Sequence, residues 1–210
     1  KKLEAELSKE LDVLLGTTAV ELDSRSASVR SQETVIGNIM ADAIRQSTGA
    51  QFAIVNGGGI RGNKVYPAGS PLSRRDILTE LPFGNTTVLV EISGAQLTDA
   101  LENGISQIDS RAGRFAQISG GKVVFDRTAA VGKRIVSLEI GGKPVDPAAK
   151  YTVAANEFIL AGGDGYSTLN KGKTLVGATD GTLMANVVMA YIRKMGAVKG
   201  EIEGRIVFAK

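Results

Sequence analysis

The 210-residue chain contains no cysteine, no histidine and no tryptophan. Without cysteine it can form no disulfide and carry out no thiolate chemistry. Without histidine it lacks the most common general base and the most common zinc ligand, which excludes Ser-His-Asp catalysis, Cys-His catalysis and histidine-based metal sites. These absences remove several frequent enzyme classes but leave the cellular compartment open.

Long apolar runs and blocks of like charge are also missing. No stretch reaches the roughly 18 apolar residues that a membrane-spanning helix needs. The 25 basic and 22 acidic residues leave a net charge of +3, which is a mild imbalance. Such a charge suits an anionic small molecule better than a nucleic acid.

Aromatic residues are scarce, at 5%, whereas glycine is abundant, with 26 residues. The abundance of glycine predicts many tight turns and close approaches of the backbone. The hydrophobic content of 43% is ordinary for a globular protein, and the length suits one sizeable core.

Apolar residues at helical spacing predict a series of helices. The leucines at 3, 7, 11 and 14 form a stripe that predicts a helix over residues 3–15, which Gly16 would end. A second helix is predicted over 33–48, with Ser31 as its N-cap and Gly49 after its last turn. Further helices are expected at 74–80, after the cap residue Ser73, and at 95–106 and 182–195.

Short β-branched and aromatic runs predict strands between these helices. They lie at 51–56, 86–93, 115–119, 122–126, 134–140, 151–158 and 205–209, with a turn at 141–146 and a long loop at 162–181. Because helices and strands are intermixed and turns join the strands of the middle block, we expect an α+β fold. Its sheet should be mixed, largely antiparallel and packed with helices.

The segment from Gly57 to Gly62 is the first candidate for a binding loop. It matches G-x-G-x-x-G, but no helix opens on its glycines and no Lys-Ser/Thr pair follows, so the Rossmann and P-loop interpretations fail. Three glycines can still form an N–H cradle, with the Arg61 guanidinium and the Asn56 amide beside it. The alternative is a glycine-rich turn with a surface arginine, and the spacing alone leaves both open.

Two further loops carry candidate residues. Phe83, in LPFGN, lies between Pro82 and Gly84 and could be presented from a loop or packed in the core. Asp164, in AGGDGY, could bind the two hydroxyls of a ribose or simply form an Asp-Gly turn. Taken singly, both residues favour the ordinary structural interpretation.

Taken together, these motifs resemble the C-terminal domain of 5′-nucleotidases. NGGGIR, LPFGN and a phenylalanine six residues before the Asp of GGDGY follow one another in the order and spacing of that family. The resemblance extends from about Ser24 to the C-terminus. It implies a substrate-binding domain over 21–210, preceded by an inter-domain linker helix within residues 1–20.

The resemblance implies roles for individual residues. Phe83 and Phe158 would hold the nucleobase between their rings, and Asp164 would bind the ribose hydroxyls. Arg61 and Arg30, the latter in RSQETVIGN, would contact the phosphate. Stacking on two aromatic faces tolerates different bases, so the specificity for the base should be broad.

The same resemblance extends the predicted substrate site to further residues. Asn56 opens the glycine motif, Asn85 would reach the base, and Gly59 and Gly113 would line the pocket. Arg25 lies one residue away from the place where some members have a further arginine. No catalytic and no metal-binding residue is expected in this chain.

The family's chemistry implies a second domain. In its members, an N-terminal metallophosphoesterase domain binds two divalent metal ions on Asp, His and Asn side chains and hydrolyses the phosphate ester. This chain lacks histidine, so we expect it to be a part of a longer nucleotidase, inactive alone and without a cofactor of its own. The expected ligand is a nucleotide or nucleoside such as AMP, and the expected location is periplasmic or extracellular.

Two alternatives remain open. The same domain could belong to a 2′,3′-cyclic-nucleotide phosphodiesterase or a UDP-sugar hydrolase, or it could be a free-standing nucleotide-binding module. The presence of both Phe83 and Phe158 favours a substrate with a base. Residues upstream of Lys1 would decide between the enzyme and the free-standing module.

Overall fold

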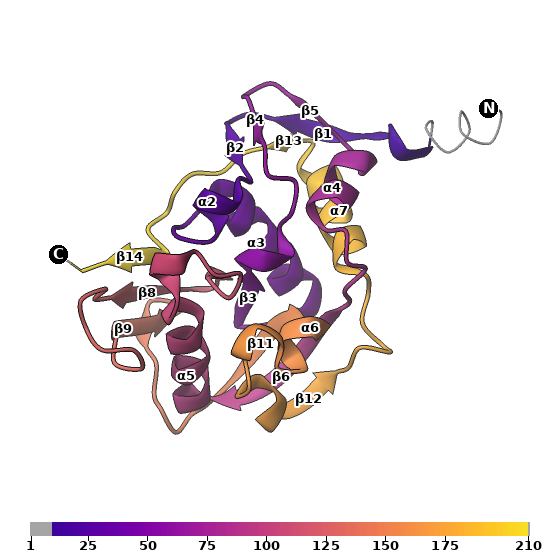
Figure 1. Cartoon of the computed structure of the whole chain (residues 1–210). Coiled ribbons are helices and arrows are strands. Elements are labelled where there is room, and N and C mark those ends of the chain that lie inside the picture. Colours follow the sequence, from indigo (N-terminus) through magenta and orange to yellow (C-terminus); the bar gives the residue numbers. More distant parts are fainter. Residues whose placement is uncertain (1–9, 210) are drawn as a thin grey trace.

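A mixed five-stranded sheet forms the centre of the computed structural model, which describes residues 10–209 (Figure 1). The strand order is β12-β6-β11-β3-β7. The strands are β12 (Lys173–Val176), β6 (Thr87–Ser93), β11 (Lys150–Asn156), β3 (Phe52–Asn56) and β7 (Ala116–Ser119). Only β3 and β11 run parallel, and the other pairings are antiparallel. The predicted α+β class with a largely antiparallel sheet is confirmed.

The central sheet is buried on both faces, and alternate residues of β3 show this directly. Ala53 and Val55 belong to one hydrophobic cluster, with α3 (Val35–Thr48) and α7 (Met184–Met195). Phe52 and Ile54 belong to the other, with α5 (Gly94–Ile105). The period of two along a strand therefore sends successive side chains into two separate cores.

A second sheet covers the face on which α5 lies. Its order is β10-β9-β8-β14, from β10 (Lys143–Pro144), β9 (Ile135–Ile140), β8 (Gly121–Phe125) and β14 (Ile206–Phe208). The segment expected as a turn at 141–146 thus includes the two-residue strand β10. The loop expected at 162–181 likewise contains β12, whose exposed residues gave no alternating pattern.

The prediction of a helix over residues 3–15 is wrong at its C-terminal end. Leu14–Thr18 form strand β1, which pairs with β5 (Pro71–Ser73) and β13 (Ala197–Val198). Gly16 lies within this strand, and a Cβ there would lie only 2.4 Å from the carbonyl oxygen of Gly196. Tertiary pairing overrides the leucine stripe here. Residues 1–9, which carry most of the predicted helix, lie outside the described residues, and the linker role remains a prediction.

Helix ends follow local capping chemistry. The structure confirms Ser73 as the cap of α4 (Arg74–Glu80), within a capping box with Asp76. Gly49 ends α3 in the left-handed conformation, also as predicted. The N-cap of α3 is Thr34 rather than Ser31: its Oγ1 accepts a hydrogen bond of 3.1 Å from the backbone N–H of Gly37.

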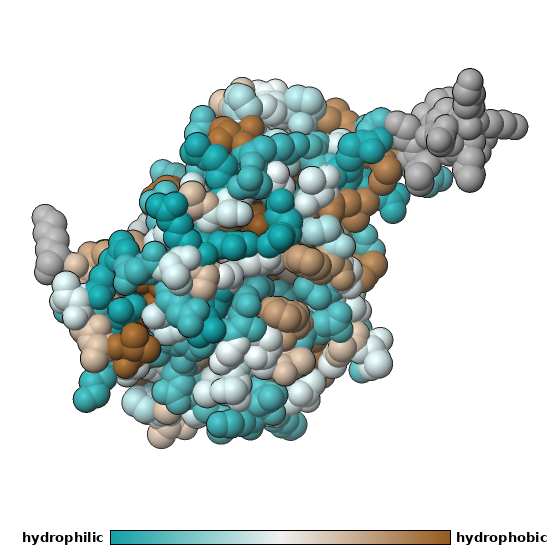
Figure 2. Space-filling model, viewed as in Figure 1, coloured by the Kyte–Doolittle hydropathy of each residue, from teal (hydrophilic) through white to brown (hydrophobic). Residues whose placement is uncertain are grey.

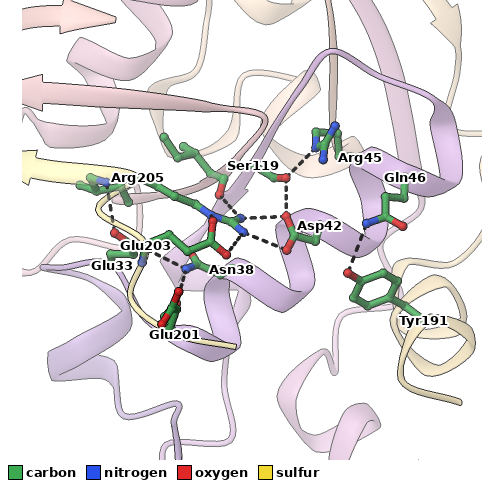
Figure 3. A network of polar contacts seen from close by, with 12 residues as sticks. Glu33, Asn38, Asp42, Arg45, Gln46, Ser119, Tyr191, Glu201, Glu203 and Arg205 are labelled. Carbon is green, nitrogen blue, oxygen red and sulfur yellow. Dashed lines mark hydrogen bonds and ion pairs between the residues drawn. The ribbon is translucent and has the colours of Figure 1, made fainter. Parts of the chain in front are cut away.

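The last strand is attached to α3 by an ionic network (Figure 3). Arg205 donates two hydrogen bonds to the Asp42 carboxylate, at 2.8 and 2.9 Å, and one to the Ile118 carbonyl. The Glu33 carboxylate accepts hydrogen bonds from the backbone N–H groups of Glu203 and Ile206. The contacts of Asp42 and Glu33 join residues more than 160 positions apart, so the C-terminal strand is fixed by side chains of α3 and the residues before it.

The remaining α-helices and strands of the described residues are short. They are α2 (Ser26–Val29), α6 (Glu157–Leu160), β2 (Leu22–Asp23) and β4 (Val65–Tyr66), the last two paired with each other. No helix in the described part of the chain is long and apolar enough to span a bilayer.

Candidate nucleotide-binding cleft

Sheet topology brings the predicted loops to one edge. β3 and β11 are parallel neighbours, so Asn56 and Asn156 end their strands side by side. β6 and β7 run antiparallel to them, so they begin where β3 and β11 end: Thr87 pairs with Asn156, and Ala116 with Asn56. The loops that follow β3 and β11 therefore meet the loops that precede β6 and β7.

These loops enclose a cleft of about 470 Å³. It is lined by Arg30, Asn56, Gly58, Gly59, Arg61, Phe83, Asn85, Gly113, Phe158 and Asp164. All nine residues predicted for the substrate site are among them, and Gly58 is the addition. Phe83 and Asp164, which favour the ordinary structural interpretation when taken singly, thus share one cleft with the glycine loop.

Two glycines form the floor of the cleft by close backbone approach. The N–H of Gly58 donates to the Gly113 carbonyl oxygen at 2.7 Å. A Cβ on Gly58 would lie 2.9 Å from the Gly113 Cα, and a Cβ on Gly113 would lie 3.3 Å from Oδ2 of Asp164. The absence of side chains here therefore leaves room beside the Asp164 carboxylate.

A relay of side-chain amides orients Asp164. Asn156 Oδ1 accepts from the N–H of Ile159, its Nδ2 donates to Asn56 Oδ1 at 2.9 Å, and Asn56 Nδ2 donates to Asp164 Oδ2 at 2.8 Å. Asn56 and Asn156 are buried, with 2% and 1% of their surface exposed. The Asp164 backbone has φ of 54°, a left-handed conformation that is uncommon for a residue other than glycine. A buried amide chain and a tight turn thus hold one carboxylate at the cleft.

Phe83 and Phe158 are both presented to solvent. Phe83 is 59% exposed and Phe158 is 44% exposed, although both are large apolar side chains. Phe158 lies in the first turn of α6, and its ring lies over Gly163, where a Cβ would be 2.6 Å from two ring carbons. Figure 2 shows hydrophobic residues on this face as small patches between hydrophilic ones. Neither ring is packed in the core, so the core interpretation of Phe83 is wrong.

Two arginines supply positive charge at the cleft. The Arg61 guanidinium lies 5.7 Å from the centroid of the Phe83 ring, within cation–π range. Arg30 follows α2, and its Nε is buried without a hydrogen-bond partner in the described structure. A buried guanidinium N–H without an acceptor is costly unless a ligand supplies one.

Arg25 lies outside the cleft lining. Its guanidinium instead forms an ion pair with Asp23 at 2.8 Å, and this contact lowers the pKa of the Asp23 carboxyl to about 2. Sequence reasoning missed Asn156, which it placed inside a strand expected at 151–158; the strand ends at Asn156, which caps α6 from Glu157 onward. It also missed Glu80, for which no local pattern gave a signal.

A smaller cavity of about 240 Å³ adjoins the cleft behind Phe83. It shares Gly59, Phe83 and Asn85 with the cleft. The rest of its lining comes mainly from residues 81–84, which follow α4, and from the start of α7, and it includes apolar side chains such as Leu81 and Met184. Within residues 10–209, no group of three or more acidic side chains is placed to hold a metal ion.

Comparison with known proteins shows the family. The model of the 5′-nucleotidase C-terminal domain matches residues 14–171, so the chain belongs to the 5′-nucleotidase C-terminal domain family. The chain is 33% identical over 202 residues to the trifunctional nucleotide phosphoesterase protein YfkN of Bacillus subtilis, covering 91% of this chain and 14% of that protein. It is 32% identical over 213 residues to the 5′-nucleotidase of Homo sapiens, covering 93% of this chain and 37% of that protein.

A solved structure shares the whole architecture. The 5′-nucleotidase precursor from Thermus thermophilus superposes with a TM-score of 0.90 at 33% identity, covering 98% of this chain and 41% of that chain. In these three comparisons the chain spans less than half of the other protein. The match is therefore to one domain of larger proteins.

Proposed function

We propose that this chain is the nucleotide-recognition domain of a longer, metal-dependent nucleotidase that hydrolyses nucleotide phosphate esters. The observation that carries the proposal is the convergence of two exposed phenylalanines, an oriented aspartate and two arginines on one cleft. Membership of the family supports it. The hydrolytic centre would lie in an N-terminal metallophosphoesterase domain that binds two divalent ions.

Each part of a nucleoside monophosphate has a matching group in the cleft. Phe83 and Phe158 would stack on the base, a contact that contributes ~1–3 kcal/mol per ring and reads no base edge. The Asp164 carboxylate would accept hydrogen bonds from the ribose hydroxyls, and Arg30 and Arg61 would pair with the phosphate. Asn85 would contact the base.

The distinction between nucleotide and nucleoside tests this assignment. AMP and adenosine are titrated into the chain, into Arg61→Ala and into Arg61→Lys, with binding followed by NMR. Loss of a charge-assisted pair costs ~1.5–3 kcal/mol. Arg61→Ala should therefore lower the affinity for AMP about tenfold or more and leave the affinity for adenosine within about twofold of the wild-type value. Arg61→Lys keeps the positive charge without the planar guanidinium, so its affinity for AMP should lie between those of the wild type and Arg61→Ala. Equal losses for AMP and adenosine would refute the phosphate role.

The chemistry is tested separately. The chain with Mg²⁺, Mn²⁺ or Zn²⁺ should release no phosphate from AMP, because the metal-binding domain is expected elsewhere in the protein. Titration with AMP, UDP-glucose and 2′,3′-cyclic AMP then ranks the substrate classes. Metal-dependent phosphate release by this chain, or no detectable binding of any base-containing ligand, would contradict the proposal. We also propose that the full protein is periplasmic, or extracellular or at the cell surface, in line with the related snake venom 5′-nucleotidase of Naja atra.

A further inference from the structure

Glu80, the last residue of α4, is a carboxylic acid with no solvent exposure. Its side chain borders the apolar residues between α3, α4 and α7, among them Ile39, Ile77 and Val188. Burial raises the pKa of the Glu80 carboxyl above its usual value. A buried acid is costly unless its oxygens are hydrogen-bonded, so its partners indicate what the residue does.

The partners of Glu80 lie mainly on the segment that carries Arg61. The Glu80 carbonyl oxygen accepts from the Arg61 N–H at 2.9 Å, and Oε2 accepts from the Gly62 N–H at 2.9 Å. Oε1 accepts from the Tyr66 hydroxyl at 2.7 Å. One residue thus holds both the beginning and the end of segment 61–66.

Gly62 is fitted to this carboxylate. A Cβ at position 62 would lie 2.0 Å from Oε1 and 2.3 Å from Cδ of Glu80. The loop therefore rests directly on the acid, with no space for a side chain between them. The Arg61 backbone is thus held by two hydrogen bonds, one from its own N–H and one from the N–H of the next residue, Gly62.

Glu80 is also close to Phe83 along the chain. Glu80 precedes Phe83 by three positions, and the Leu81 N–H still closes the last turn of α4 on Ile77. Phe83 in turn lies under the Arg61 guanidinium. We infer that Glu80 is a positioning residue that sets where Arg61 stands relative to Phe83, and so sets the preference of the cleft for nucleotides over nucleosides. This inference rests on the proposed phosphate role of Arg61.

A purely structural role for Glu80 would lead to different behaviour. If the acid only stabilised the fold, its loss would lower the melting temperature and weaken all ligands alike. A positioning role predicts that affinity for AMP falls while affinity for adenosine is kept, because only the phosphate senses Arg61.

The test compares AMP and adenosine affinities, by NMR titration of the 210-residue chain, in three variants. Glu80→Met removes both carboxylate oxygens at similar side-chain volume. It should lower the affinity for AMP about tenfold and leave the affinity for adenosine within about twofold of the wild-type value. Glu80→Gln keeps an oxygen for the Gly62 N–H and gains an amide that can donate to the Tyr66 hydroxyl oxygen, so it should restore the AMP preference. Tyr66→Phe removes the hydroxyl alone and should leave the preference unchanged.

A fourth variant, Gly62→Ala, changes the loop and not the acid. Gly62→Ala keeps the acid and pushes the loop from it, so it should lose AMP preference in the same way, and it decides the matter if Glu80→Met does not fold. In the wild-type chain the Arg61 and Gly62 amides should be protected from hydrogen exchange. An unchanged ratio of AMP to adenosine affinity in the folded variants, or rapid exchange of both amides, would overturn the inference. If Arg61→Ala itself leaves the ratio unchanged, the proposed phosphate role fails instead.

Discussion

Asn56 and Asp164 lie 108 positions apart, and the Asn56 amide donates a 2.8 Å hydrogen bond to the Asp164 carboxylate. The bond joins the last residue of β3 to the turn that follows α6. The amide of Asn56 is thus directed toward the aspartate. We therefore propose that Asn56 acts on the ribose side of the proposed site.

Asn56→Ala should destabilise the chain and weaken ribose binding together. The change removes the donor to Asp164 and leaves the buried Asn156 amide without its acceptor, which costs ~1–3 kcal/mol. Urea unfolding measures the loss of stability, and titrations with adenosine and adenine measure the ribose contribution. Adenosine should lose affinity, whereas adenine should not. Unchanged adenosine affinity in a folded variant would show that the Asp164 orientation does not matter for the sugar.

Phe83→Ala and Phe158→Ala should each weaken base binding by ~1–3 kcal/mol. AMP and adenosine should be affected equally, because both carry the base. Since both rings are partly exposed, the free energy of unfolding should change less than it would for a phenylalanine in the core. Leu at either position serves as the matched control, because it keeps apolar contact without a stacking face. Affinity retained in the alanine variants would exclude stacking.

Arg30→Met should stabilise the ligand-free chain and lower its affinity for AMP. The wild-type residue has a buried Nε without a partner, a cost of ~1 kcal/mol or more that methionine avoids at similar length. Thermal unfolding without ligand measures the gain, and titration with AMP measures the loss. A variant that is less stable than the wild type would mean that Arg30 is structural.

Asp42→Ala should cost ~3–5 kcal/mol of stability, because it removes the more buried of the two carboxylates that pair with the buried Arg205 guanidinium. The Arg205 side chain is only 10% exposed, whereas Glu203, its other partner, is 48% exposed. Glu203→Ala is therefore the matched control and should cost at most about 1 kcal/mol. The double variant Asp42→Ala/Arg205→Met should recover much of the loss. Equal effects of the two single variants in urea unfolding would contradict this difference in burial.

Elements with a strong local signal could be predicted from the sequence. The stripe of α3, the capping box at Ser73 and the continuous apolar run of β3 each depend on neighbours within a few residues. β1, β5 and β13 could not be predicted, since two- to five-residue strands exist only through pairing partners far along the chain. The leucines before β1 suggested a helix because the helical period is readable locally and the pairing is not.

The candidate site divides in the same way. The residue types and the order of the motifs can be read from the sequence. They were enough to predict Phe83, Phe158 and Asp164 as residues of the substrate site. Tertiary structure alone decided that both rings stand exposed, that Asn56 orients the aspartate and that Glu80 supports Arg61. The contact between Asn56 and Asp164 depends on the parallel pairing of β3 and β11, which brings the ends of two strands far apart in the sequence side by side. A local pattern can identify a side chain, but only the folded chain sets the atom that it faces.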